Sequence, residues 1–483
     1  MYKHFSDMAY NYKTEPYKHQ IDALEKAAHH VEWAFFMDMG TGKTKTTIDN
    51  IGLLYHERKI NSAVVVAPKS VYLNWEKEID THLPDAVNRY IHCWNVTKNK
   101  KFDPFKNKLC GSLTVLLINV EALSTKRGLE SVSKFLQLNK HTFFVIDEST
   151  TIKNPQAKRT KNILALAKLS KYRRILTGSP VTKSPLDLYT QCAFLNPELL
   201  GFKSYYTFRA RYAEMHTIYT GPDRQVLVPK FYKNLDDLEF KLKQFSTRIT
   251  KDECLDLPEK IYRTRHVYLG EKQRALYDKL KANAIAMLQD TTVSFTNKLT
   301  EILRLHQVCN GFINDDDGDK LELENPKMKE LDGILDEIDG KVIIWANYIH
   351  NIEDITKYLK KKYGQHSTVT MYGATNVGQR KEAIQFFQEN PECRFFVANP
   401  QTGGHGLTLT AASYVIYFSN NYNLELRLQS EDRAHRIGQK KNVVYIDLIA
   451  KDTVDQKIVE SLINKNKISA ETMGEEIKSW LSE

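Results

Sequence analysis

Residues 33–54, WAFFMDMGTGKTKTTIDNIGLL, join an apolar run to a segment of helical length through a glycine-rich turn. Glycines let the backbone of such a turn curl until several N–H groups point into one cavity, and the start of the next helix adds partial positive charge. The turn therefore predicts a phosphate-binding loop, in which Lys43 reaches the β- and γ-phosphates of a nucleotide and Thr44 ligates magnesium. The other loop residues predicted to hold the nucleotide are Met39, Gly40, Thr41 and Gly42. Met37 stands where the general G-x-x-x-x-G-K-[ST] pattern has its first glycine, and a plain glycine turn is the alternative interpretation.

Short apolar or β-branched runs recur on both sides of this loop, separated by more polar stretches of helical length. Near-continuous apolar runs of this size are typical of strands buried on both faces of a parallel sheet. The chain therefore predicts an α/β fold with two parallel-sheet lobes of the doubly wound type. The expected strands are Trp33–Met37, Ala63–Ala67, Leu113–Val120, Phe143–Ile146 and Arg174–Leu176 in the first lobe, and Val342–Trp345, Thr368–Met371, Phe395–Ala398, Tyr414–Phe418 and Val443–Ile449 in the second.

The middle of the chain has a different pattern. From about residue 184 to 326 the strand rhythm is lost, and Glu271–Gln289 and Phe295–Cys309 show the apolar spacing of helices. We therefore expect a first lobe over residues 1–250, with a helical protrusion from about 184. We expect a second lobe over residues 251–483, with a helical insertion at about 270–326 and a C-terminal helical brace at 451–483.

Composition excludes several protein classes. Hydrophobic residues make up 42% and charged residues 27% of the 483 residues, which excludes wholesale disorder. We expect no membrane segment, because no run approaches the roughly 18–20 apolar residues that a membrane helix needs, and the N-terminus has no apolar signal core. The six cysteines are scattered without a C-x-x-C pair, which favours a reducing cytosol over zinc or disulfide chemistry. A cytoplasmic location is expected, nucleoid-associated in a bacterium or phage, and a nuclear one stays open.

Charge is distributed unevenly along the chain. The whole sequence carries a formal charge of +10, and residues 1–250 hold 38 Lys and Arg against 24 Asp and Glu, a net of +14. Between Ser149 and Leu186 there are nine basic residues and no acidic one: Lys153, Lys158, Arg159, Lys161, Lys168, Lys171, Arg173, Arg174 and Lys183. Such a stretch could follow a phosphate backbone. A soluble basic surface without a polyanionic partner is the alternative.

Two further clusters carry candidate chemistry. The apolar run FFVIDE at 143–148 ends in two acids, at the strand end where open α/β sheets place ligands. Asp147 is expected to hold magnesium and Glu148 to polarise the attacking water as general base. Arg433 and Arg436 lie three residues apart, on one face if the segment is helical, and could stabilise a transferring phosphoryl group. A helix cap at Asp147-Glu148 and ordinary surface salt bridges at the arginines are the alternatives.

Taken in order, these segments resemble the motor of superfamily-two helicases, and specifically the Swi/Snf-type DNA translocase family. The match covers nearly the whole chain, and the R-A-H-R-I-G-Q string together with the I-K-N after Asp147-Glu148 favours Swi/Snf over a generic helicase. It resembles compact bacterial or phage members. The matching segments are Tyr17–Gln20, Met39–Thr44, Val64–Glu78, Asp147-Glu148 with Ile152–Asn154, Leu176–Pro180, Lys341–Trp345, Gly403–Thr410 and Gln429–Gln439.

The resemblance implies two RecA-like lobes and an ATP-dependent translocase of double-stranded DNA, a DNA-stimulated ATPase that uses ATP and Mg²⁺ in a cleft between the lobes. Gln20 would read adenine, and Gly406 and Gln429 would join the nucleotide site. Other nucleic acids remain possible partners, and protein partners are unknown. The residues implied to face nucleic acid are Lys69, Ser70, Lys153, Asn154, Thr177 and Gly178. Trp75 is expected to be a core residue, because it lies in an amphipathic segment.

The chain departs from the family pattern at several positions. Ser149-Thr150 stand where the family usually has Ala-His after the two acids, and Gln401-Thr402, His405 and Thr408 are unusual in the segment before Thr410. The acids survive, so these departures bear on coupling and not on hydrolysis.

Three alternative functions stay open at this point. One is a strand-separating DNA or RNA helicase, and another is a DNA-binding protein with an inactive ATP site. The intact Lys43, Asp147, Glu148, Arg433 and Arg436 argue against the second. The third is a small-molecule P-loop kinase, in which a second lobe and its arginines have no role.

Overall fold

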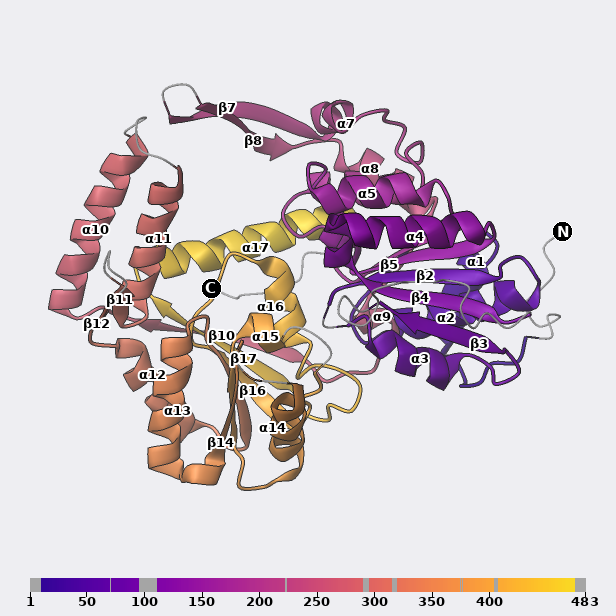
Figure 1. Cartoon of the computed structure of the whole chain (residues 1–483). Coiled ribbons are helices and arrows are strands. Elements are labelled where there is room, and N and C mark those ends of the chain that lie inside the picture. The colour runs from indigo at the N-terminus through magenta and orange to yellow at the C-terminus, as the bar shows by residue number, and fades with distance from the viewer. Residues whose placement is uncertain are drawn as a thin grey trace. The chain divides into compact units, whose positions relative to one another are not determined.

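The computed structural model describes residues 10–69, 71–94, 111–221, 224–289, 295–314, 319–373, 375, 377–403 and 407–473 (Figure 1). Ser70 and Gly406, which belong to the expected sites, lie outside these residues. The chain divides into two compact units. The first takes its described residues from Met1–Ala213, Tyr232–Asp256 and Ile468–Glu475, and the second from Glu214–Phe231 and Leu257–Lys467.

A seven-stranded sheet forms the centre of the first unit, and all its described strand pairs are parallel. Its strands alternate with helices, so the carboxyl ends of the strands share one edge. The sheet order is β3 (Arg89–Cys93), β4 (Leu113–Asn119), β2 (Ser62–Ala67), β5 (Thr142–Asp147), β6 (Tyr172–Thr177), β1 (Glu32–Met37) and β9 (Ser246–Ile249).

Helices cover both faces of this sheet because the central strands are apolar on both sides. One face carries a core in which Phe35 and Val65 of the sheet pack with Ile48 of α2 and Trp75 of α3. On the other face, Phe144 of β5 meets Phe194 of α6 at a ring distance of 5.0 Å. The helices of this unit are α1 (Lys18–Ala27), α2 (Lys43–His56), α3 (Asn74–His82), α4 (Lys126–Leu138), α5 (Lys158–Ala167), α6 (Leu188–Leu195), α7 (Tyr205–Tyr212), α8 (Leu235–Lys243) and α9 (Lys251–Cys254), with short 3₁₀ turns at Val120–Ser124, Ser149–Ile152 and Pro185–Asp187.

The second unit has a six-stranded parallel sheet of the same kind. One of its faces buries Ile344 with Ile334 and Ile355 from two helices, and the other buries Trp345 with Phe387. Its order is β10 (Lys260–Val267), β17 (Val443–Ala450), β16 (Ala412–Tyr417), β13 (Lys341–Trp345), β15 (Phe395–Ala398) and β14 (Thr368–Met371). Its helices are α10 (Glu271–Gln289), α11 (Phe295–Cys309), α12 (Pro326–Glu337), α13 (Ile349–Tyr363), α14 (Val377–Glu389), α15 (Pro400–Gly403), α16 (Leu424–Glu431) and the part of α17 (Val454–Met473) before Ile468, with a 3₁₀ turn at Gln365–Ser367.

The expected α/β class with two parallel-sheet lobes and helical insertions is confirmed, and each expected strand is present within one or two residues. Helical segments dominate from about residue 184 to 326, as expected, but strands that the sequence did not predict are also present. That region contains β9 and β10, which extend the two large sheets, and two small sheets made by β7 (Ala213–Gly221) with β8 (Arg224–Tyr232) and by β11 (Phe312–Asn314) with β12 (Lys320–Glu322). These strands are short or partly exposed, so they lack the continuous apolar runs by which buried strands are recognised. Within the described residues, no helix is both long enough and apolar enough to cross a membrane.

Candidate functional site

The phosphate-loop segment turns between β1, which ends at Met37, and α2, which begins at Lys43. Gly40 and Gly42 have φ angles of 85° and 88°, a left-handed conformation that favours glycine. A Cβ atom on Gly42 would also lie 1.9 Å from Nε2 of Gln20. Both backbone shape and lack of space therefore require glycine here, and the turn brings the loop to the positive end of α2.

Gln20 and His19 hold this loop from the start of α1. Nε2 of Gln20 donates to the carbonyl oxygen of Thr41 at 3.1 Å, and the ring nitrogen Nε2 of His19 lies 2.8 Å from the same oxygen. The side-chain oxygen of Gln20 accepts from the backbone N–H of Tyr17 at 3.1 Å. The structure thus places Gln20, expected to read adenine, directly against the phosphate loop, with both ends of its amide bonded.

Lys43 is the first residue of α2, and only 8% of it is exposed. Across the part of the chain that the structure describes, no hydrogen bond or ion pair engages its ammonium group. An ammonium group without a partner, at the end of a side chain that is otherwise almost buried, is placed to meet an anion that enters the loop. The neighbouring Thr44 is half-buried. A phosphate group bound in the loop would therefore neutralise the positive charge of Lys43.

Asp147 and Glu148 leave the sheet at the same edge as the phosphate loop. Asp147 pairs with Leu176 of β6, and Leu176 pairs with Phe35 of β1, so Asp147 lies in one row with a residue two positions before the end of β1. Two strand spacings correspond to about 10 Å, a separation that a magnesium-bound triphosphate spans. Glu148 has a φ of 51° and a ψ of 64°, and backbone strain of this kind in a non-glycine residue recurs at functional sites.

Both oxygens of the Asp147 carboxylate receive N–H donors. The backbone N–H of Glu148 donates to Oδ1 at 3.0 Å, and the indole N–H of Trp75 donates to Oδ2 at 2.9 Å. The expectation that Trp75 is a core residue is confirmed, because only 1% of it is exposed. The hydrogen bond from Trp75 to Asp147 was not predicted from the sequence, although the position of Trp75 in the matched segment Val64–Glu78 indicated a functional role. An oriented carboxylate, an unpaired lysine and a threonine at the helix start together fit a magnesium-bound nucleotide.

Arg248 of β9 ties the loop to the turn after β6. Its guanidinium Nη1 lies 2.8 Å from Oδ1 of Asp38 and donates to the carbonyl oxygens of Phe36 and Gly178 at 3.2 and 3.1 Å. A Cβ atom on Gly178 would meet the backbone nitrogen of Met39 at 3.2 Å. The turn after β6 therefore packs against the phosphate loop, so a shift of one would move the other.

The residues expected to face nucleic acid fall into two groups. Lys69 and Asn154 are exposed, whereas Thr177 is 1% exposed and its hydroxyl accepts from the backbone N–H of Ser179 at 3.1 Å. Lys153 is half-buried and donates to the hydroxyl of Thr182 at 2.5 Å. Thr177, like Gly178, thus lies inside the phosphate-loop end of the unit and not on its surface.

The acid-free basic stretch is also mixed. Lys158, Lys161, Lys168 and Lys171 are exposed, but Arg174 is completely buried and donates to five groups: Oδ1 of Asn50 and the carbonyls of Ala27, His30, Val31 and Arg173. Burial lowers its pKa to about 9. Arg174 therefore does not contact a phosphate backbone as the basic stretch suggested. Its guanidinium group instead donates hydrogen bonds to buried oxygen atoms in the core.

In the second unit, Arg433 and Arg436 converge on one backbone oxygen. Nη1 of each donates to the carbonyl of Leu407, at 3.4 and 3.0 Å respectively. Both arginines follow α16, which ends at Glu431, so the condition for a shared helical face is not met and the backbone turn after the helix places them instead. Arg433 is 2% exposed, and burial lowers the pKa of Arg436 while Asp432 opposes that effect.

Neighbouring side chains hold these arginines in place. Nε2 of Gln439 donates to the carbonyls of Thr410, Ala412 and Ala434 at 2.8 to 3.1 Å, and the ring nitrogen Nε2 of His435 lies 2.7 Å from the carbonyl of Pro258. Gln429 is 5% exposed, and its buried Oε1 has no hydrogen-bond partner in the described structure. Such an orphaned acceptor marks a place for a ligand donor.

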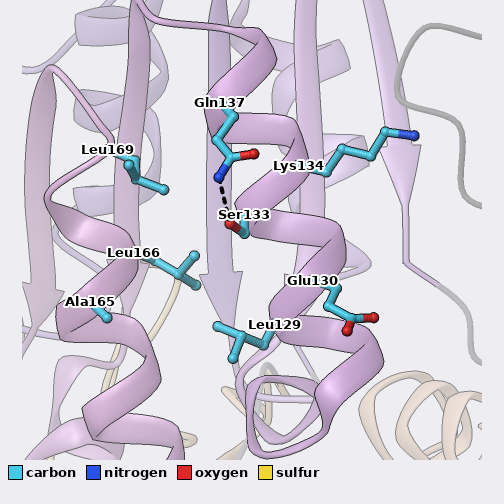
Figure 2. A pocket seen from close by; sticks show the side chains of 8 residues that line it. All are labelled: Leu129, Glu130, Ser133, Lys134, Gln137, Ala165, Leu166 and Leu169. Atoms are coloured by element: carbon cyan, nitrogen blue, oxygen red, sulfur yellow. Dashed lines mark hydrogen bonds between the residues drawn. The ribbon is translucent and has the colours of Figure 1, made fainter.

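A pocket of about 460 Å³ lies on the first unit between α4 and α5. Leu129 and Leu166 face each other across it, while Glu130 and Lys134 point outward from α4 (Figure 2). None of its lining residues belongs to an expected site. Within the described ranges, no group of three or more His, Cys, Asp or Glu residues could hold a metal ion, so a magnesium site here depends on the nucleotide for further ligands.

Comparison with known proteins identifies the family. Residues 27–312 match the SNF2-related domain, and residues 326–438 match the helicase conserved C-terminal domain. The chain belongs to the SNF2-related family. This confirms the resemblance drawn from the motifs, and the two matched regions together contain all the described site candidates except Gln20.

Relatives of this SNF2-related chain include an uncharacterized ATP-dependent helicase of Mycoplasma genitalium, 28% identical over 456 residues that make up 92% of this chain and 40% of that protein. Chromodomain-helicase-DNA-binding protein 1 of Gallus gallus is 26% identical over 447 residues, 88% of this chain and 24% of that protein. A solved structure, the Sulfolobus solfataricus SWI2/SNF2 ATPase core in complex with dsDNA, is 26% identical with a TM-score of 0.44, covering 96% of this chain and 95% of that one. The chain thus spans less than half the length of the two curated relatives.

Proposed function

We propose that this chain is an ATP-driven translocase of double-stranded DNA. The observation that carries the proposal is the arrangement at one sheet edge, where the nearly buried Lys43 and the strand-end acids Asp147 and Glu148 leave the same parallel sheet. Membership of the SNF2-related family supports an ATP-dependent motor.

The residues divide the chemistry between them. The loop N–H groups and Lys43 bind the phosphates, and Thr44 with Asp147 would hold a magnesium ion, which neutralises charge on the β- and γ-phosphates. Glu148 orients the attacking water and accepts its proton. Gln20 and Arg248 keep the loop in shape. We assign to Arg433 and Arg436 the stabilisation of negative charge on the transferring phosphoryl group.

Double-stranded DNA is proposed as the track on which the motor moves. The name of the Gallus gallus relative includes DNA binding, and the first half of this chain has a net charge of +14. Exposed Lys158, Lys161, Lys168 and Lys171 on and after α5 suit contacts to phosphates, which bind without regard to base sequence. Movement along the duplex without strand separation rests on the family resemblance.

The test measures ATP hydrolysis by the full chain with duplex DNA, single-stranded DNA and RNA at two salt concentrations. We expect magnesium-dependent turnover that duplex DNA stimulates and salt weakens. A triplex-displacement assay then tests movement, and a forked duplex tests strand separation. Stimulation by RNA alone, or separation of the forked strands, would overturn the proposal, as would the absence of DNA-stimulated phosphate release.

Point variants assign the roles. Lys43→Ala should abolish turnover and weaken nucleotide binding, whereas Glu148→Gln should abolish turnover and keep nucleotide binding, because it removes only the base. Arg436→Ala should lower turnover by about 10³–10⁵-fold, the range measured for arginine fingers. Lys134→Ala, which removes an exposed charge from α4, is the control and should change none of these. Normal turnover in Glu148→Gln would refute its assignment as base.

A further inference from the structure

Trp75 connects two segments for which the sequence suggested separate roles. Its indole N–H donates to Oδ2 of Asp147 at 2.9 Å, across 72 positions of sequence. Only 1% of Trp75 and 4% of Asp147 is exposed, so water does not compete for this bond. A charge-assisted hydrogen bond in such surroundings is stronger and more directional than one at the surface.

The hydrogen bond from Trp75 fixes the direction in which the carboxylate oxygens of Asp147 face a bound cation. Oδ1 accepts from the N–H of Glu148, which belongs to the same turn, whereas the donor to Oδ2 comes from α3. With a donor on each oxygen, the plane of the carboxylate is set. Donors that orient a metal ligand from behind typically change metal affinity by about 10–100-fold when they are removed.

The helix that carries Trp75 also has exposed residues at its start. Trp75 is the second residue of α3, and its inner neighbour Ile79 packs in the same core. Lys69 after the end of β2, Leu73 and the first helix residue Asn74 are exposed. Further along α3 the exposed Glu76 and Asp80 flank Lys77 with negative charge, so only the start of the helix suits a phosphate backbone. A rigid-body shift of α3 on contact with nucleic acid would therefore move the indole N–H relative to Asp147.

We propose that Trp75 is a positioning residue that orients the magnesium-binding carboxylate of Asp147 and makes that orientation respond to nucleic acid bound at Lys69 and the start of α3. The inference has a metal half, in which Trp75 orients Asp147, and a nucleic-acid half, in which bound nucleic acid changes that orientation. The nucleic-acid half rests on the proposed function. The metal half depends only on nucleotide and magnesium, so the two halves can fail separately.

The experiment compares Trp75→Phe with Trp33→Phe in the full chain. Phenylalanine keeps an aromatic ring and loses the N–H. Trp33 is a matched control, since its indole N–H donates to the hydroxyl of Thr247 at 2.9 Å within the same core. Binding of a non-hydrolysable ATP analogue is measured with and without Mg²⁺, and thermal unfolding is recorded for both variants.

We expect Trp75→Phe to bind the analogue like wild type without Mg²⁺ and to lose about 10–100-fold of the affinity that Mg²⁺ adds. Stimulation of turnover by duplex DNA should also fall, while Trp33→Phe changes neither quantity. Unchanged magnesium dependence in Trp75→Phe, or an equal loss in Trp33→Phe, would overturn the inference. If wild type shows magnesium-dependent binding but no DNA stimulation, the proposed function and the nucleic-acid half fail together, and the metal half is still decided.

A second measurement removes the risk that Trp75→Phe does not fold. The wild-type chain, which has five tryptophans, is labelled with 5-fluorotryptophan, and the Trp75 resonance is assigned by its absence in a Trp75→Tyr chain or by elimination. Addition of Mg²⁺ to the analogue-bound protein should shift this resonance and leave that of Trp33 in place, and duplex DNA should shift it again. A Trp75 resonance that shifts neither with Mg²⁺ nor with duplex DNA would refute the inference.

Discussion

Ser149 and Gln191 form a buried hydrogen-bonded pair, and a double-mutant cycle can measure how much this bond contributes to the free energy of unfolding. The hydroxyl of Ser149 donates to Oε1 of Gln191 at 2.6 Å, and Nε2 of Gln191 donates to the carbonyls of Pro180 and Asp187, each at 2.8 Å. Both Ser149 and Gln191 are 0% exposed. Because the two carbonyls need donors, the amide cannot turn over, and Ser149 must supply the hydrogen to Oε1.

Ser149→Ala, which restores the residue usual in the family, leaves Oε1 of Gln191 buried without a donor. The expected loss is about 1–3 kcal/mol in the free energy of unfolding, the cost of an unsatisfied buried acceptor. For a unit of this size that corresponds to a fall of roughly 2–12 °C in melting temperature, at about 2–4 °C per kcal/mol. Ser131→Ala is the control, since the hydroxyl of Ser131 only donates within its own helix at 2.8 Å, and it should cost little.

The second arm of the cycle is Gln191→Met, alone and with Ser149→Ala. The double variant removes both ends of the bond, so its loss should be smaller than the sum of the single losses by about 0.5–3 kcal/mol. Urea unfolding of the four chains measures this coupling. If Ser149→Ala is neutral, or if the two losses simply add, the pair does not link the turn after β5 to the turn after β6.

Three further predictions follow from buried or exposed charges. Arg174→Met should cost about 3–5 kcal/mol of stability in urea unfolding, because it strips donors from the core, and a melting temperature like wild type contradicts this. Lys171→Ala should instead leave stability unchanged and lower the slope of log affinity for DNA against log salt by about 1, whereas an unchanged slope places Lys171 off the DNA. Burial raises the pKa of Asp49 to about 6, with Lys45 acting in the opposite direction. The folded state therefore holds this proton more tightly than the unfolded state, and stability should fall by about 3 kcal/mol as the pH rises from about 4 to above 6. Asp49→Asn should flatten that part of the curve in urea titrations, and an equally steep curve would exclude Asp49 as its source.

Local patterns were enough to predict the strands at the centre of each sheet. Val64 and Ile344 each lie in a run that is apolar on both faces, and such runs are typical of buried parallel strands. The bounds of α10 and α11 were predicted in the same way from apolar spacing. The edge strands β3, β9 and β10 were missed, because half-exposed strands such as Lys260–Val267 mix polar and apolar residues without a clear period.

The nucleotide loop was predictable because its chemistry is local. The glycines, Lys43 and Thr44 are consecutive, and a loop followed by a helix creates the same array of N–H groups whatever surrounds it. Asp147 and Glu148 were found for a related reason, since an acid at the end of a buried strand must lie at a sheet edge. The amino-acid sequence thus determines the phosphate loop, the strand-end acids and the family.

The roles of Trp75, Arg174 and Gln191 were decided only by the tertiary structure. Each is a long or aromatic side chain whose polar atoms find partners far away in sequence: Trp75 at Asp147, Arg174 at Asn50, and Gln191 at Ser149. From sequence, an arginine in a basic run is indistinguishable from one that contacts a phosphate, and a tryptophan in an amphipathic helix predicts burial but not a bond. Burial requires every such group to find a partner, and only the packed chain determines which partner is within reach.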